Sequence, residues 1–451
     1  MRVLARSPGS LSALGLLALL AACGDDVVLI DARGDAGVPP SDGAPGDAMV
    51  EPDGGAPLHP AAYPAGRTQS PLTPFVVENL RAVRARADDL QDDVFAKVGA
   101  SSTVSTSFVH CFAGDDVDLD GRELEGTVSF FAEGDAGGTS PYTRESLAAT
   151  VGWHAGRALD GDPSPLEQEV EAIRPGWAVV MYGTNDINIV TLEDYAENML
   201  DLTDALLDRG VVPLLTTIMP RGDDPDADAE VPDFNMALRA IAEARQVPLI
   251  DYHRELVDLP DQGLSADGIH PSVLRDPGAR ACVLNPEGLA YGYNVRNLVT
   301  LEALDRVRRA VVEGEGAPDP AGPALEGDGS PTAPWVIDRL PFAHVANTLF
   351  SDHRELDLYD GCMADQDESG PEYLYRLELE RATSLRIFVF DRGDVDIDLH
   401  VLDAPTEAGC VQRAHRQLDA DLGVGTWYLA LDTFVGSREQ AGEYVLAIME
   451  R

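Results

Sequence analysis

Basic residues are scarce in this chain of 451 residues, which has 33 Lys and Arg against 78 Asp and Glu and a formal net charge of −45. Because such a chain repels phosphate backbones and anionic lipid headgroups, nucleic-acid binding through charge is excluded. No glycine-rich fingerprint for phosphates or dinucleotides follows a predicted strand. No Cys-x-x-Cys or Cys/His spacing typical of zinc occurs. These absences argue against nucleic-acid-binding proteins, phosphoryl-transfer enzymes and zinc-binding modules.

Long hydrophobic runs are also missing beyond the first two dozen residues. The exception is the run Leu11 to Ala22, which follows Arg2 and Arg6, ends in Leu-Ala-Ala-Cys and is too short to span a bilayer. This pattern resembles a bacterial lipoprotein signal. We therefore expect a signal peptide over residues 1–22 and a lipid on Cys23 that is the only link to the membrane. The protein would then lie in the bacterial cell envelope. An ordinary secretory signal, in which Cys23 is incidental, remains open.

Cysteine is rare as well, and four cysteines remain once Cys23 is set aside. An even number suits an oxidising compartment and suggests disulfides. The simplest pairing gives one disulfide in each of two predicted domains, although three connectivities and free thiols are open at this stage. The four residues are Cys111, Cys282, Cys362 and Cys410.

The length exceeds what one core usually supports, so two folded domains are expected. Residues 23–70 are rich in Asp, Gly, Ala and Pro and poor in aromatic residues, which is typical of a disordered tether. A second stretch of this kind, residues 314–334, predicts a linker between domains at 71–313 and 335–451. No repeat of solenoid length is visible.

In the first domain, short β-branched runs alternate with helical patterns, which indicates βαβ units and a parallel sheet. We predict a three-layer α/β/α arrangement with helices on both faces. In such sheets, ligands collect at the carboxyl ends of the strands. The predicted strands are Val94–Val98, Thr127–Phe131, Trp177–Tyr182, Val211–Ile218 and Val247–Tyr252, and the clearest helices are Leu192–Arg209, Phe234–Arg245 and Asn294–Val312.

Polar residues follow three of these strand ends. Ser101 comes after Gly99, where the chain turns sharply from a strand into a helix, and Asn185 follows the strand that ends near Tyr182. Asp267 and His270 stand three residues apart in a turn-prone loop. An aspartate at this spacing can hold one ring nitrogen of the histidine and direct the other toward a nucleophile. Each fragment alone has an ordinary structural explanation, but their joint occurrence predicts a catalytic site.

The motifs KVGASST, YGTND and DGIHPS resemble the blocks of the SGNH hydrolases, also called the GDSL esterase and lipase superfamily. The resemblance covers about residues 75–312. It implies a flavodoxin-like parallel sheet and ester hydrolysis through a serine nucleophile. By motif, Ser101 would be the nucleophile and an oxyanion donor through its backbone amide, and Asn185 a second oxyanion donor. Asp267 and His270 would complete the triad.

Two departures from the family pattern stand out. Ala100 occupies the position where the family normally has aspartate, which puts the positioning of the loop in doubt more than the chemistry. The glycine that supplies a further oxyanion amide has no obvious counterpart. We assign this role to Gly138, with Gly152 and Ala148 as alternatives.

The resulting functional hypothesis is an exported serine hydrolase that cleaves carboxylic esters through an acyl-enzyme on Ser101. Its substrates would be small-molecule, polysaccharide or lipid esters, with short-chain or O-acetyl groups preferred. The mechanism requires no metal and no organic cofactor. The alternative is a catalytically silent lipoprotein that binds envelope polysaccharide, and Ala100 is the feature that favours it.

After residue 334 the pattern changes to period-two alternation with turn signals, which predicts an antiparallel β-sandwich. The stretches DVDIDLHVLD, GVGTWYLALD and GEYVLAI resemble the bacterial pre-peptidase C-terminal domain over about residues 334–449. Substrate targeting, surface attachment and solubility are all compatible with this resemblance.

Two acidic clusters resemble calcium-binding stretches, namely Asp115–Gly121 and Asp394–Asp398. The first begins like an EF-hand loop but has Thr127 instead of glutamate at its twelfth position. The second alternates with apolar residues, as an exposed strand face does. In so acidic a chain we expect solvated carboxylates at both, and we name no metal ligand.

Overall fold

The structure is a computed structural model that describes residues 58–364 and 366–451. The predicted signal peptide, Cys23 and most of the predicted tether lie outside the described residues. Within the described part, no helix combines the length and the hydropathy that a membrane crossing requires.

The first part of the described chain contains a four-stranded parallel sheet with the strand order β1-β2-β3-β4. Every residue of β2 and β3 is buried, as expected of strands that helices cover on both faces. The predicted parallel sheet is therefore confirmed. Its strands are β1 (Gln91–Gly99), β2 (Pro175–Met181), β3 (Val212–Thr216) and β4 (Leu249–Ile250).

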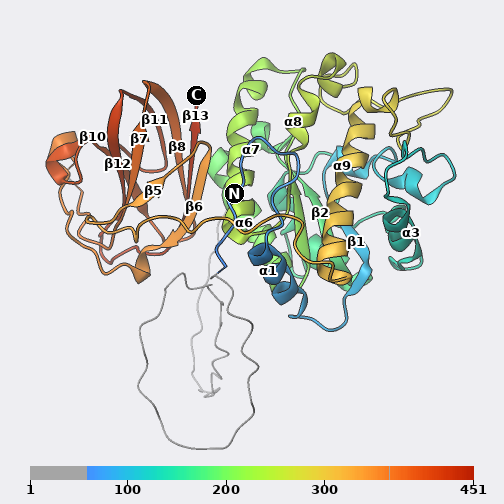
Figure 1. Cartoon of the computed structure of the whole chain (residues 1–451), viewed down its shortest axis with the longest axis horizontal. Helices are drawn as coiled ribbons and strands as arrows, with labels where there is room; N and C mark the ends of the chain where they lie inside the picture. Colours follow the sequence, from blue (N-terminus) through green and yellow to red (C-terminus); the bar gives the residue numbers. More distant parts are fainter. Residues whose placement is uncertain (1–57, 365) are drawn as a thin grey trace, which may run out of the picture. The chain divides into compact units, whose positions relative to one another are not determined.

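Helices cover this sheet, with α6 and α7 packed against each other on one side and α9 on the other (Figure 1). The helices are α1 (Pro74–Arg84), α2 (Ser101–Val104), α3 (Glu125–Glu133), α4 (Pro165–Ile173), α5 (Asp186–Ile189), α6 (Leu192–Asp208), α7 (Pro225–Arg245), α8 (Tyr252–Leu256) and α9 (Gly292–Val307). A π-helical turn over Arg308–Val312 follows α9. This arrangement fits the α/β fold of SGNH hydrolases.

Local sequence explains where the longer helices start. The Thr191 side chain caps α6 in a reciprocal capping box with Asp194, and the Asp224 side chain accepts hydrogen bonds from the first turn of α7. Because of the cap at Asp224, α7 begins nine residues before the predicted start at Phe234. The predicted helix at 192–209 is confirmed.

One predicted strand is wrong, because Thr127–Phe131 lies within helix α3. Thr127 and Phe131 are both fully buried and four residues apart, so they share one face of a helix. The ring of Phe131 packs edge-on against Phe95 of β1, with 5.4 Å between centroids. Tertiary packing thus overrides the β propensity of this stretch.

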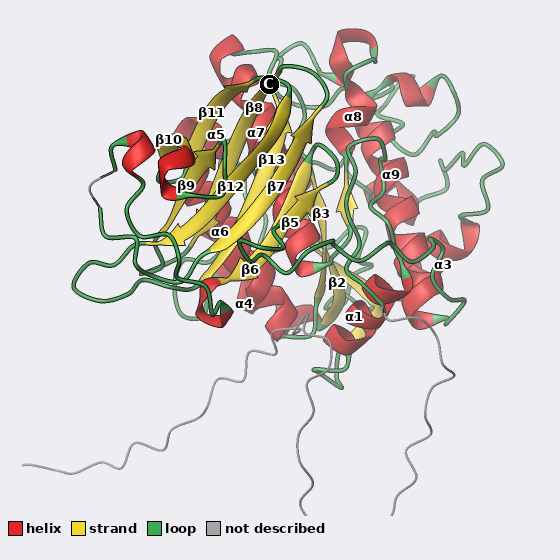
Figure 2. Cartoon of the chain, turned by 60° about the vertical axis from the view of Figure 1, so that its left-hand side comes forward, coloured by secondary structure: helices red, strands yellow, loops and turns green. Residues whose placement is uncertain are grey.

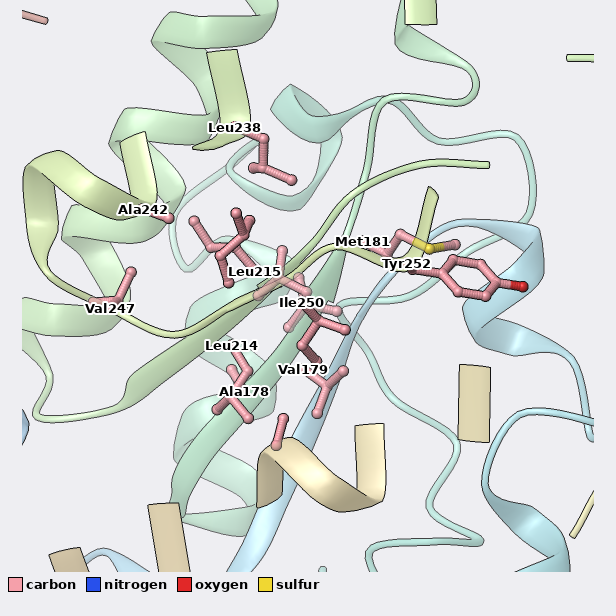
Figure 3. Packing of buried hydrophobic residues seen from close by; sticks show 14 of the residues in the cluster. Ala178, Val179, Met181, Leu214, Leu215, Leu238, Ala242, Val247, Ile250 and Tyr252 are labelled. Carbon is pink, nitrogen blue, oxygen red and sulfur yellow. The ribbon is translucent and has the colours of Figure 1, made fainter. Parts of the chain in front are cut away.

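The core between the sheet and the helices is apolar. Leu238 and Ala242 of α7 lie on the side of Leu215 and Ile250 of the sheet (Figure 3), and all four side chains are 0–1% exposed. Burial of this kind stabilises by roughly 25 cal/mol per Å² of apolar surface. This core fixes the strand ends that carry the polar motifs.

The second part of the described chain forms two sheets with orders β10-β9-β12-β7-β5 and β11-β8-β13-β6, whose strands run side by side in Figure 2. All strand pairs are antiparallel except β5 with β7, so the predicted β-sandwich is confirmed. The strands are β5 (Trp335–Ile337), β6 (Phe342–Asn347), β7 (Tyr373–Leu379), β8 (Thr383–Asp391), β9 (Ile397–Leu402), β10 (Cys410–Ala414), β11 (Gln417–Leu422), β12 (Gly425–Thr433) and β13 (Glu443–Glu450).

Two disulfides follow the simplest predicted pairing. Cys111 bonds to Cys282 and Cys362 bonds to Cys410. One therefore falls in each of the two predicted domains, as is typical of proteins that fold in an oxidising compartment.

The second acidic cluster departs from its prediction. Asp394 is exposed, with 84% of its side chain accessible, but Asp398 is only 2% exposed. The expectation of solvated carboxylates is therefore wrong for Asp398, because it lies in β9 on a face of the sheet that other residues cover.

Candidate active site

The carboxyl end of β1 places Ser101 at the start of helix α2. Gly99 is required there because a Cβ atom on it would lie 2.6 Å from the carbonyl oxygen of Met181 in β2. Ser101 is the first residue of α2, so its backbone N–H has no acceptor inside the helix. Its side chain is partly exposed.

His270 connects Ser101 with Asp267. Its Nε2 lies 2.8 Å from the Ser101 hydroxyl oxygen, and its Nδ1 lies 2.8 Å from Asp267 Oδ2. Asp267 Oδ1 accepts hydrogen bonds from the backbone N–H groups of Ile269 and His270, both at 3.0 Å, and from the Ser265 hydroxyl at 2.8 Å. The turn thus holds the carboxylate through three donors and orients the ring.

These hydrogen bonds also set the ionisation of Asp267. Partial burial raises the pKa of its carboxyl group, but the donors from His270, Ile269 and Ser265 outweigh burial and hold the pKa well below its usual value. Asp267 is therefore a carboxylate throughout the neutral range and can stabilise a positive charge on His270.

The carboxyl end of β2 carries Asn185. The Asn185 side-chain amide donates to the carbonyl oxygen of Trp153 at 2.8 Å. The buried carboxylate of Asp186 accepts from the backbone N–H groups of Gly183 and Ala155, each at 2.8 Å. Asp186 thus ties the turn after β2 to the loop that precedes Ala155, and this tie fixes the position of Asn185.

The loop before Trp153 runs beside the end of β1. The Thr150 N–H donates to the carbonyl oxygen of Gly99 at 3.1 Å, and the Gly99 N–H donates to that of Ala148 at 3.2 Å. Gly152 lies between Thr150 and Trp153 with φ of +80°, a value that favours glycine. The loop is therefore anchored both at Gly99 and at Asn185.

Gly138, the predicted oxyanion donor, lies far from Ser101. Its N–H donates to Asp135 Oδ1 at 2.6 Å, and the Asp135 carbonyl accepts from the side chain of Gln91, the first residue of β1. Ser101 follows the other end of this nine-residue strand, roughly 25 Å away at the usual rise per residue. The structure therefore does not bring Gly138 to Ser101, and this part of the prediction is wrong.

A buried arginine in α9, which sequence reasoning missed, holds α2 in place through hydrogen bonds. Arg296 of α9 is fully buried and donates to the Ser102 carbonyl at 2.7 Å and to Thr103 Oγ1 at 3.0 Å. Its guanidinium also lies 3.8 Å from the ring centre of Phe108, and burial lowers its pKa to about 10. No local pattern distinguishes Arg296, because Asn294, Asn297 and Thr300 of the same helix are also polar.

A shallow cavity of about 360 Å³ opens beside Ser101 and His270. Hydroxyl groups contribute much of its lining, from Ser105, Ser107, Ser265 and Ser272, together with Tyr293 and Arg275. Such a lining suits a small polar group better than a long acyl chain.

Metal-compatible groups lie away from Ser101. Among the described residues, the groups of three or more His, Cys, Asp or Glu side chains that are close enough to share an ion are both in the β-sandwich. One of them contains Cys362 and Cys410, which form a disulfide.

Part of the chain matches a known protein family. Residues 127–274 match the model of the GDSL-like lipase/acylhydrolase family. No curated protein matches the chain.

Among solved structures, a GDSL-like lipase from Bacteroides thetaiotaomicron is similar, with 15% identity, a TM-score of 0.32, and coverage of 51% of this chain and 98% of that one. An acetylxylan esterase from Geobacillus stearothermophilus has 15% identity, a TM-score of 0.31, and coverage of 47% and 93%. At this level of identity these structures say nothing about substrate. The family match supports the conclusion that this chain contains a GDSL-like hydrolase domain.

Proposed function

We propose that this protein is a serine ester hydrolase in which Ser101 is the nucleophile, His270 the general base and Asp267 the residue that orients His270. The observation that carries the proposal is the position of the His270 ring, with one nitrogen 2.8 Å from the Ser101 hydroxyl and the other 2.8 Å from the Asp267 carboxylate. A nucleophile, a base and an orienting carboxylate in hydrogen-bond contact are what acyl transfer requires.

The reaction would proceed in two halves. His270 Nε2 accepts the proton of the Ser101 hydroxyl while the oxygen attacks the ester carbonyl, and then returns this proton to the departing alcohol. Water, activated by the same nitrogen, cleaves the acyl-enzyme and regenerates the serine. Asp267 stabilises the imidazolium that forms in each half. These steps use only groups of this chain and water.

The negative charge that develops on the carbonyl oxygen needs hydrogen-bond donors. The Ser101 backbone N–H is one candidate, and Asn185 offers a second, since a primary amide has two N–H groups and, among the described residues, the amide of Asn185 donates to the Trp153 carbonyl alone. We assign the third donor to the N–H of Gly152 in place of Gly138, because the loop of Gly152 is anchored at Gly99 and at Asn185.

The acyl group is expected to be short. The cavity beside Ser101 is lined by five serines and by only three largely apolar side chains, Pro271, Val273 and Tyr293, so a long alkyl chain would find few apolar side chains to pack against. We therefore expect kcat/KM for p-nitrophenyl acetate to exceed that for p-nitrophenyl octanoate by at least about tenfold. A buried methylene group contributes roughly 0.8 kcal/mol of binding energy, but the octanoyl chain gains this energy only if apolar side chains surround it. A clear optimum at long chains would contradict this assignment, and acetylated oligosaccharides are the next substrates to assay.

A further inference from the structure

A buried arginine in the loop between β3 and α7 contacts the turn that carries Asn185. Arg221 is only 3% exposed, and an arginine is almost never buried to this extent unless its charge is paired. Its Nη1 donates to the carbonyl oxygen of Thr184 at 2.7 Å and to Asn188 Oδ1 at 2.8 Å. Thr184 directly precedes Asn185 and Asn188 follows it in α5. The guanidinium group therefore contacts this turn on both sides of Asn185.

The other edge of the guanidinium group is bound by Asp223. Nε donates to Asp223 Oδ1 at 2.8 Å, and Nη2 donates to Asp223 Oδ2 at 2.9 Å. Because a planar guanidinium matches both oxygens of a carboxylate, this pair fixes the orientation of the group as well as its position. Together with the bonds from Nη1, these bonds occupy most of the N–H donors of Arg221.

The loop that carries Arg221 and Asp223 is itself fixed in place. Its backbone packs against Gly268, since a Cβ atom on Gly268 would lie 2.7 Å from the backbone nitrogen of Asp223 and 2.8 Å from the carbonyl carbon of Gly222. The backbone N–H of Arg221 donates at 2.8 Å to Oδ1 of Asp228, in the first turn of α7. The guanidinium group is thus held from a firm base.

The bond to Thr184 bears directly on Asn185. The two residues share one planar peptide group, so a donor on the Thr184 carbonyl fixes the plane from which the Cα atom of Asn185 extends. The Trp153 carbonyl accepts from the side-chain amide of Asn185 at 2.8 Å. Arg221 therefore fixes the backbone at Asn185, whereas Trp153 fixes the side chain.

A direct effect of the Arg221 charge on the reaction is a weaker explanation. The charge is paired with the carboxylate of Asp223, and hydrogen bonds from Arg221 hold the pKa of that carboxyl group below its usual value. The pair is therefore neutral as a whole. Arg221 is also not among the residues that line the cavity beside Ser101. Any effect on catalysis should accordingly pass through the residues that Arg221 holds.

We propose that Arg221 is a positioning residue that holds Asn185 where its amide can donate to the oxyanion. The inference rests on the proposed function, in which Asn185 is an oxyanion donor. Such a donor must lie about 3 Å from the position that the charged oxygen takes in the transition state. A displacement of about 1 Å can cost on the order of 10²-fold in rate. Loss of the Arg221 contacts should therefore slow catalysis without a change in any reacting group.

The first test compares Arg221→Gln with the wild type on p-nitrophenyl acetate. We expect kcat to fall at least about tenfold and KM to stay within about twofold, because the displaced donor acts only on transition-state charge. Arg221→Lys keeps the charge opposite Asp223, so it tests the proposal even if Arg221→Gln is unstable. Its single amine cannot replace the planar fork, and kcat should still fall at least about fivefold. A wild-type kcat in either variant would overturn the proposal.

Arg245→Gln is the matched control. Arg245 makes the same two-pronged contact with Asp204, at 2.6 and 2.9 Å, but it is the last residue of the 21-residue helix α7. It therefore lies roughly 30 Å from the end of α7 that adjoins Arg221, at the usual rise per residue. This variant should unfold at a lower temperature but keep kcat within about twofold, because the pair is structural.

A double-mutant cycle shows whether Arg221 acts through Asn185. In the Asn185→Ala background, Arg221→Gln should lower kcat by less than about threefold, since the donor that Arg221 positions is already gone. A further tenfold loss in this background would mean that Arg221 acts by another route, and the inference would fail while the proposed function stands. A wild-type kcat in Asn185→Ala alone would instead refute the oxyanion role of Asn185, and this inference with it.

Discussion

Replacement of Ser101 by alanine is expected to lower kcat for p-nitrophenyl acetate by at least about 10⁴-fold. The variant keeps the backbone N–H and helix α2 but lacks the oxygen that attacks the carbonyl, so no acyl-enzyme can form. The fold should be unaffected, because the Ser101 hydroxyl bonds only to the ring of His270 among the described residues. The measurement is steady-state hydrolysis together with a thermal unfolding curve.

Ser107→Ala provides the matched control, since Ser107 lines the same cavity and its hydrogen bonds to other described residues, Ser105 and Asn297, are made by its backbone. This variant should keep at least about half of the wild-type rate, as expected when only a cavity wall changes. If Ser101→Ala and the wild type hydrolysed the ester at equal rates, Ser101 would not be the nucleophile. A catalytically silent protein that binds polysaccharide would then be the better description.

Asn185→Ala is expected to slow turnover by about 10²- to 10³-fold, the usual effect of removing one oxyanion donor. The loss should appear in kcat rather than KM, because the donor acts on charge that develops only in the transition state. The Asn185 amide also holds the Trp153 carbonyl, so a modest loss of stability is expected in addition.

The Asn188→Ala variant separates the loss of the oxyanion donor from a loss of local stability. Asn188 lies in α5, the short helix that directly follows Asn185, and accepts a hydrogen bond from Arg221, so its replacement disturbs this region without removing the proposed donor. Asn188→Ala should retain kcat within about threefold, because it loses only one hydrogen bond remote from the reacting atoms. A kcat of Asn185→Ala equal to that of the wild type would remove Asn185 from the oxyanion site.

Much of the fold and three of the site positions could be predicted because their signals are local. Buried parallel strands have continuous apolar runs, so β1 and β2 are found from the sequence alone. Ser101, Asp267 and His270 directly follow turns marked by glycine or by turn-prone residues. Their meeting needed only the rule that the carboxyl ends of parallel strands share one edge.

Other features depend on contacts between distant segments. Thr127–Phe131 has strand-like residues but becomes helical because Phe131 packs on Phe95. Gly138 and Gly152 are equivalent in sequence terms, and only the hydrogen bonds of the loop at Gly99 distinguish them.

The burial of charged side chains could not be predicted from the sequence either. Arg296 in α9 and Glu368, in the loop before β7, look like surface residues in the sequence, yet both are fully buried. The groups that contact Arg296, at Ser102, Thr103 and Phe108, come from a segment far away in the chain, so no local pattern reveals its burial.

The most direct test of the central claim, that His270 activates Ser101 as a nucleophile, is covalent labelling of the wild type with an alkyl fluorophosphonate. An activated serine displaces fluoride from such a reagent and keeps the phosphonyl group. Peptide mass spectrometry should find one phosphonyl group per chain, on the peptide that contains Ser101, and none on this peptide in His270→Ala. An unlabelled Ser101, or labelling that persists without His270, would contradict the account.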